Sequence, residues 1–142
     1  SGQWDKALAD FQATLKLQPN EPQVLNYLGY SWLMRGEKLV EAEAMLKQAL
    51  DAAPNEPNIM DSYGYALYLR GDYKAAFQMY EKALALLPQD PTMNEHYGDV
   101  LWKMGRRTEA HYHWERAIEF KPTEPGAQMR LKEKIEKNTL MH

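Results

Sequence analysis

Apolar residues recur every three or four positions along most of the chain, which is the pattern of amphipathic helices. One clear example lies between a glycine and a proline and comprises Tyr73, Ala76, Phe77, Tyr80, Ala83, Leu84 and Leu87. Glycine ends helices readily, and Asp72 is a residue type that caps the start of the next one. The pattern therefore predicts one helix from Pro57 to Leu69 and a second from Asp72 to about Leu87.

This pair of helices repeats along the sequence. Proline pairs recur at intervals of 35, 34 and 34 residues, at 19 and 22, 54 and 57, 88 and 91, and 122 and 125. Four further columns keep the same interval: Gly29, Gly64 and Gly98; Gly2, Gly36, Gly71 and Gly105; Ala7, Ala42, Ala76 and Ala110; and Phe11, Leu46, Tyr80 and Trp114. Gly64 lies in mid-helix, where glycine is unfavourable, so we expect the paired helix to approach it closely at Tyr80. Helix pairs of this kind bury their apolar faces only by stacking on their neighbours.

The register divides residues 1–142 into one domain of several units. We expect a half unit with only a second helix at 1–21, full units at 22–56, 57–90 and 91–124, and a capping helix at 126–138. An extra residue near Lys38 and Leu39 should bulge the turn between the helices of the first full unit. The capping helix should point its charged side to solvent: Lys132, Glu133, Lys134, Glu136 and Lys137.

The third unit resembles the tetratricopeptide repeat family in Tyr63, Gly64, Leu67, Gly71, Tyr73, Ala76, Tyr80, Ala83 and Pro88. The resemblance implies an all-α fold, a right-handed superhelix of helix-turn-helix repeats, and a role in binding other proteins. Residues 25–30 and 61–65 are similar to the C-terminal repeats of longer bacterial tetratricopeptide proteins, some of them envelope-associated. The compartment therefore stays open between bacterial cytoplasm and periplasm.

Composition narrows the function classes. Lys and Arg number 17 against 20 Asp and Glu, so the chain lacks the basic excess of a nucleic-acid binder. It has no cysteine, which excludes disulfides, thiolate metal sites and a cysteine nucleophile. No apolar run is long enough to span a membrane. No phosphate-binding loop, dinucleotide motif or zinc-protease motif occurs. We expect no catalytic residue, metal or cofactor, and we interpret the four histidines as surface or packing residues.

The first helices of the units should line a concave groove, with one face free for a partner. Helical spacing assigns to this face Asn26, Tyr30, Leu33 and Met34; Asp61, Tyr65, Tyr68 and Leu69; and Glu95, Asp99 and Trp102. Tyrosine and tryptophan often carry binding energy at interfaces. The carboxylates predict an acidic groove that suits an apolar protein or peptide partner with basic residues. A family subclass binds peptide C-terminal carboxylates, but its basic residues are absent from the matching positions, so we do not expect that activity.

Two alternatives to this noncatalytic scaffold differ in what the chain binds. The first is a structural module that self-assembles through the ends of its solenoid. The second is an enzyme, which would need a cofactor or a closed pocket. Trp4, Ala7, Leu8, Phe11 and Leu15 of the first helix have no partner helix before them in the sequence. We therefore expect an exposed apolar face there and a homodimer through it.

Overall fold

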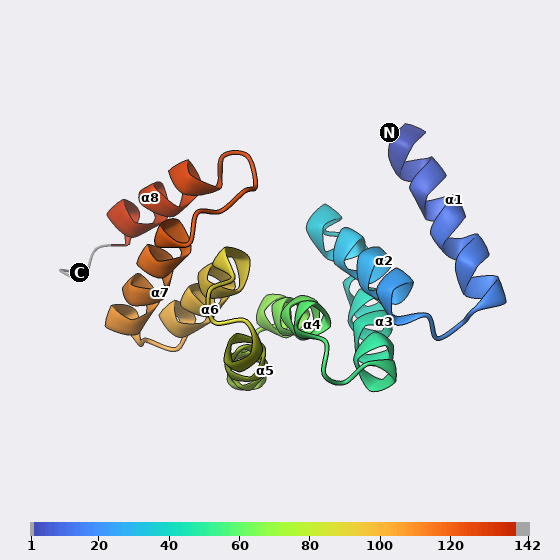
Figure 1. Cartoon of the computed structure of the whole chain (residues 1–142), viewed down its shortest axis with the longest axis horizontal. Coiled ribbons are helices and arrows are strands. Elements are labelled where there is room, and N and C mark those ends of the chain that lie inside the picture. The colour runs from blue at the N-terminus through green and yellow to red at the C-terminus, as the bar shows by residue number, and fades with distance from the viewer. Residues whose placement is uncertain (1, 139–142) are drawn as a thin grey trace.

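Eight α-helices and no strand make up the part of the chain that the computed structural model describes, residues 2–138. Figure 1 shows them as a curved row of pairs running from the N-terminus to the C-terminus. The helices are α1 (Gly2–Leu17), α2 (Pro22–Arg35), α3 (Leu39–Ala52), α4 (Pro57–Arg70), α5 (Tyr73–Leu86), α6 (Pro91–Lys103), α7 (Arg107–Glu119) and α8 (Ala127–Lys137). The all-α repeat superhelix predicted from the sequence is confirmed.

The helices pack mainly with their neighbours in sequence. The pairs α2 and α3, α4 and α5, and α6 and α7 make the most extensive contacts, and each pair also packs on the next. The first helices α2, α4 and α6 touch one another in turn and so form one continuous side of the row. Each unit thus completes its core only through its neighbours.

Helices α2, α4, α5 and α6 begin at prolines or aspartates, which are the residue types expected at helix starts. Proline occupies the first turn of α2, α4 and α6, where its missing N–H leaves no bond unmade. The Asp90 and Asp72 side chains accept hydrogen bonds from the first turns of α6 and α5. The extra residue of the first full unit is accommodated by Lys38, which adopts a left-handed conformation with φ of 50° just before α3.

Close approach of paired helices explains the mid-helix glycines. A Cβ added to Gly64 would lie 2.8 Å from Cε2 of Tyr80, and one added to Gly98 would lie 2.5 Å from Cδ1 of Trp114. The rings of Tyr80 and Trp114 are buried in the same core as Leu67 and Leu101. Glycine is therefore required where a large ring of the second helix crosses the first.

The expectation of an exposed apolar face on α1 is wrong. Trp4, Leu8, Phe11 and Leu15 pack against a core formed by residues of α2, α3 and α4. The Trp4 ring meets Trp32 edge to face at 5.2 Å between centroids, and Phe11 stacks on Tyr27. Helix α2 takes the place of the partner helix that α1 lacks, although no residue of α1 is fully buried.

Candidate functional site

A pocket of about 200 Å³, open to solvent, lies among the first helices and α8. Its lining comes from α2, α4, α6, α8 and the linker before α8, and comprises Tyr30, Met34, Tyr65, Thr92, Glu95, His96, Asp99, Glu124, Arg130 and Lys134. We call this the groove pocket. It combines tyrosine rings and a methionine with a dense set of charged groups.

Tyr65 is the aromatic centre of the groove pocket. Its ring stacks on His96 with 4.6 Å between centroids and on Tyr68 at 5.8 Å. Burial is the main cause that raises the pKa of Tyr65, and burial with the nearby Asp61 carboxylate raises that of Tyr30 to about 12. Both hydroxyls therefore stay protonated at neutral pH and can donate hydrogen bonds to a ligand.

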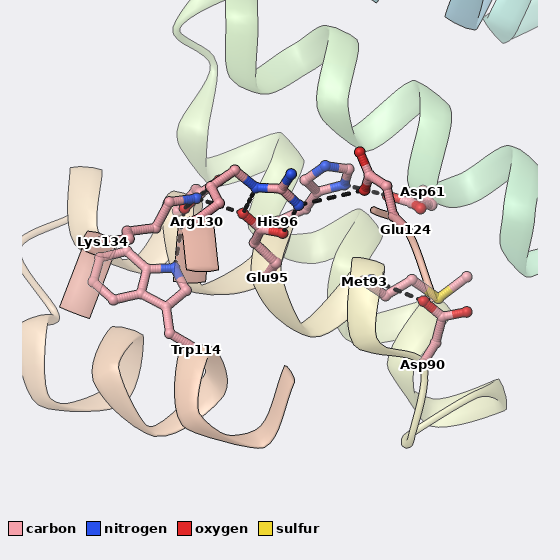
Figure 2. A network of polar contacts seen from close by, with 10 residues as sticks. Asp61, Asp90, Met93, Glu95, His96, Trp114, Glu124, Arg130 and Lys134 are labelled. Atoms are coloured by element: carbon pink, nitrogen blue, oxygen red, sulfur yellow. Dashed lines mark hydrogen bonds and ion pairs between the residues drawn. The ribbon is translucent and has the colours of Figure 1, made fainter. Parts of the chain in front are cut away.

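Asp61 joins three helices beneath that ring. Its Oδ1 lies 2.8 Å from Nδ1 of His96 on α6 and accepts a hydrogen bond of 2.8 Å from the Tyr80 hydroxyl on α5. Burial alone would lower the pKa of His96, but the Asp61 carboxylate outweighs it and the pKa is raised. The pair is visible in Figure 2 and fixes the ring on which Tyr65 stacks.

Glu95 is a buried carboxylate held by two cations of α8. Arg130 binds it with two parallel hydrogen bonds, Nε to Oε2 at 2.9 Å and Nη2 to Oε1 at 2.7 Å. Lys134 adds a third bond, Nζ to Oε2 at 2.7 Å. Burial opposes ionisation, but these bonds outweigh it and lower the pKa of Glu95 to about 2. Glu95 is therefore charged at every physiological pH.

Asp99 completes the network one turn further along α6. It accepts hydrogen bonds from Nζ of Lys134 at 2.9 Å and from Nε1 of Trp114 at 3.0 Å. Burial nevertheless raises its pKa above the ordinary value, because desolvation outweighs the attraction of Lys134. Figure 2 shows Lys134 reaching across Trp114 to this network.

These contacts correct the expected electrostatics. Lys134 was expected to face solvent, but only 22% of its side chain is exposed, and Arg130 also reaches into the groove pocket. The groove therefore contains basic groups that the sequence interpretation lacked, supplied by the helix interpreted only as a solvated cap. The expected absence of basic residues from the groove is therefore wrong, while carboxylates still outnumber the permanent cations around it.

The repeat register contains the signal that would have found this network. His96 lies 35 residues after Asp61, and Arg130 lies 35 residues after Glu95. The two pairs are the same contact in successive units, so α8 stands where the first helix of another unit would stand. Its Ala127 and Leu131 are buried accordingly. Extending the column of His96 by one repeat of 34 residues points directly to Arg130.

The structure brings together five of the predicted groove residues in the pocket lining: Tyr30, Met34, Tyr65, Glu95 and Asp99. Leu33 is placed differently. It is only 5% exposed and belongs to the core around Leu28 and Trp32, so its expected exposure in the groove is wrong. Leu33 and Leu69 instead line a separate apolar hollow beside Leu39 and Val40.

Three further predicted groove residues pack against other side chains instead of lining the groove pocket. Asn26 is 6% exposed, and its Oδ1 is buried without a hydrogen-bond partner among the described residues. Tyr68 packs on Tyr65 of its own helix and on Tyr73 of α5, so it belongs to the packing within one repeat. Trp102 lies 5.6 Å from the Trp114 ring and 5.8 Å from the His111 ring.

The histidines act in packing and hydrogen bonding. His113 Nδ1 lies 2.9 Å from Asn94 Oδ1, and His111 Nε2 contacts the carbonyl oxygen of Asn138. His142 lies outside the described residues. Within residues 2–138, no group of three or more His, Cys, Asp or Glu side chains is placed to hold a metal ion. None of the described helices is long and apolar enough to cross a membrane.

A stack of antiparallel helix pairs with a groove along its first helices defines a helical-repeat protein. Tetratricopeptide repeat family models match residues 1–57 and 64–105. The chain belongs to the tetratricopeptide repeat family, whose members are generally noncatalytic protein-interaction modules. No curated protein sequence matches the chain.

Solved structures share the fold at low sequence identity. The translocator chaperone SycD of Yersinia enterocolitica is 19% identical with a TM-score of 0.72, covering 84% of this chain and 92% of SycD. MamA is 21% identical with a TM-score of 0.72, covering 96% and 87%. The first repeat domain of Spaghetti (RPAP3), bound to an HSP90 peptide, is 22% identical with a TM-score of 0.67, covering 80% and 89%.

Proposed function

We propose that the chain is a noncatalytic scaffold that binds a peptide or helical segment of a partner protein in the groove pocket. The observation that carries the proposal is the half-buried Tyr65 ring at the centre of an open pocket, flanked by Tyr30 and Met34. Large aromatic anchors surrounded by polar groups are typical of energetic centres in interfaces. Two structures of the same fold support it: Spaghetti holds an HSP90 peptide, and SycD holds a peptide of the translocator YopD.

The partner segment should be apolar with one or more basic residues. Three carboxylates line the groove pocket, Glu95, Asp99 and Glu124, and a fourth, Asp61, contacts the lining residue His96. They stand against the permanent cations Arg130 and Lys134. One or two negative charges therefore remain, depending on whether His96 is protonated. Charge complementarity favours a basic segment, although less strongly than three unopposed carboxylates would.

Selection from a random peptide display library on the folded full chain tests this proposal. Tyr65→Ala should weaken the selected peptides at least thirtyfold, as truncation of a central aromatic does. Tyr112→Ala is the matched control, because Tyr112 is an exposed tyrosine of α7 outside the groove pocket. Equal effects of the two substitutions, or selected peptides without apolar and basic enrichment, would contradict the proposal.

Self-assembly through the solenoid ends is the second candidate function. It is favoured by α1, which packs on one side only and leaves Leu17 exposed. A homodimer through α1 would bury this helix further. Light scattering over a range of concentrations tests the idea, and Leu17→Lys should shift any dimer toward monomer. A monomer at all concentrations rules it out.

A further inference from the structure

Two arginine–glutamate pairs in this protein share one geometry but differ in environment. Arg106 binds Glu109 through Nε at 2.8 Å and Nη2 at 2.7 Å, closely matching the bonds from Arg130 to Glu95. The arginine side chains are almost equally exposed, 41% and 42%. Glu109 is also exposed, whereas the Glu95 side chain is only 6% exposed. Glu95 is thus a fixed, buried anion whose counterion reaches it from the open side.

The Arg130 side chain can leave Glu95 without displacing α8. The helix is anchored by Ala127 and Leu131, each 1% exposed, and by Lys134, which bonds both Glu95 and Asp99. Arg130 itself lines the groove pocket and also contacts the exposed Glu124 at 3.4 Å. Rotation about its own side-chain bonds would carry the guanidinium toward Glu124 and open Glu95 to the pocket.

A cation entering the groove pocket would then meet a carboxylate already shaped for a planar, two-pronged donor. A buried carboxylate that loses its counterion is strongly unfavourable, so it favours any replacement that restores both bonds. Arginine meets this requirement better than lysine, because its donors form a rigid fork.

We propose that Glu95 is the subsite for an arginine of the partner, and that Arg130 is its internal occupant, which the partner's arginine replaces on binding. This inference rests on the proposed function, since it concerns the same groove pocket. It assigns a regulatory role to α8, because Arg130 of this helix occupies the Glu95 site that would recognise the partner. Competition of this kind lowers the apparent affinity for the partner in proportion to the fraction of molecules in which Glu95 is free.

The decisive probe is N-acetyl-arginine amide, with N-acetyl-citrulline amide as its neutral equivalent of the same shape. Binding to the full chain is followed by NMR shifts of the Glu95 and His96 amides. Arg130→Ala should bind the arginine probe at least tenfold more tightly than the unsubstituted chain, because the competitor is gone. Arg106→Ala, the matched control, should bind it as the unsubstituted chain does, and Glu95→Gln combined with Arg130→Ala should abolish the gain.

Three outcomes would overturn the inference: no gain in Arg130→Ala, an equal gain for the citrulline probe, or a gain that survives Glu95→Gln. Arg130→Met, which keeps the aliphatic stem, replaces Arg130→Ala if thermal melting shows that the alanine variant is unfolded. The result is separable from the proposed function. If the arginine probe behaves as expected but Tyr65→Ala binds selected peptides normally, groove binding fails while the subsite stands. If only the probe fails, the groove proposal stands without the exchange.

Discussion

His96 on α6 and Asp61 on α4 form a hydrogen bond of 2.8 Å across the boundary between two repeats. Glu95 and Arg130 make the equivalent contact one repeat later, joining α6 to α8. Both pairs lie beneath or beside the groove pocket, so the groups that would bind a partner also hold neighbouring repeats together. The proposed function therefore couples binding to stability.

The Asp61–His96 pair predicts that stability falls as pH rises above neutrality. Asp61 raises the pKa of His96 above its ordinary 6.5, so the folded state binds the proton more tightly than the unfolded chain. The stabilisation is complete below pH 6.5 and disappears as pH rises through the folded pKa. Asp61→Asn should remove about 1–2 kcal/mol at pH 6 and much less at pH 9, which thermal melting across this range measures.

His113 provides the control for that experiment. Burial lowers its pKa, so its contribution has the opposite sign and is lost as pH falls below 6.5. His113→Asn should therefore leave the loss of stability above neutrality unchanged. If His113→Asn abolishes that loss, or Asp61→Asn lowers stability equally at both pH values, the assignment to His96 is wrong.

Gly98→Ala should destabilise the protein although alanine favours helices. The added methyl would lie 2.5 Å from Nε1 of the buried Trp114, which also hydrogen-bonds Asp99 and so cannot shift freely. Overpacking of this kind costs roughly 1–3 kcal/mol, more than the gain in helix propensity of about 1 kcal/mol. Denaturant unfolding measures the difference, with Gln128→Ala on the exposed side of α8 as the control. An unchanged or raised stability would contradict the close packing.

Arg130→Ala should cost more stability than Arg106→Ala. Removing one partner of a buried ion pair typically costs about 3–5 kcal/mol, and the remaining Lys134 bond to Glu95 should reduce this to roughly 2 kcal/mol. The Arg106–Glu109 pair is exposed and screened by solvent, so its loss should cost much less. Chemical denaturation measures the free energy of unfolding of the two variants. Equal losses would show that burial of Glu95 does not strengthen its ion pair. Adding Glu95→Gln to Arg130→Ala should recover part of the loss.

Most of the fold followed from the sequence because local signals agree with one another. Proline at helix starts, glycine at helix ends and the 34-residue interval define α2 to α7, and the packing of Gly64 on Tyr80 was expected from the same register. The role of α8 was missed because its charges were judged by their own helix alone. Whether Lys134 faces solvent depends on Glu95 and Asp99, which are 39 and 35 residues away.

The groove was predicted as a set of residues but not as a surface. Helical spacing correctly grouped Tyr30, Tyr65 and Asp99, which line one pocket. It misplaced Leu33, because one helical face is divided between core and groove by how closely α4 packs on α2. Such a division depends on the angle between helices, which periodicity does not contain. The same limit applies to α1, because periodicity does not show that its apolar side packs on α2.

Tyr65→Ala should lower stability only modestly, by about 1 kcal/mol, through the lost stacking on His96 and Tyr68. Leu67→Ala, two residues along α4 and only 3% exposed, should cost roughly 2–5 kcal/mol. Thermal and denaturant unfolding of both variants checks the contrast. If Tyr65→Ala is as damaging as Leu67→Ala, the ring belongs to the core and is not available to a partner.

The most direct test of groove binding places a photo-crosslinking benzoylphenylalanine in the full chain at position 65 or at position 112. A display-selected peptide is then added, and crosslinked adducts are mapped by mass spectrometry. Binding in the groove pocket predicts an adduct from position 65 that unlabelled peptide abolishes, and none from position 112 on the exposed side of α7. An adduct from position 112 alone, or equal adducts from both positions, would place the partner elsewhere and contradict the account.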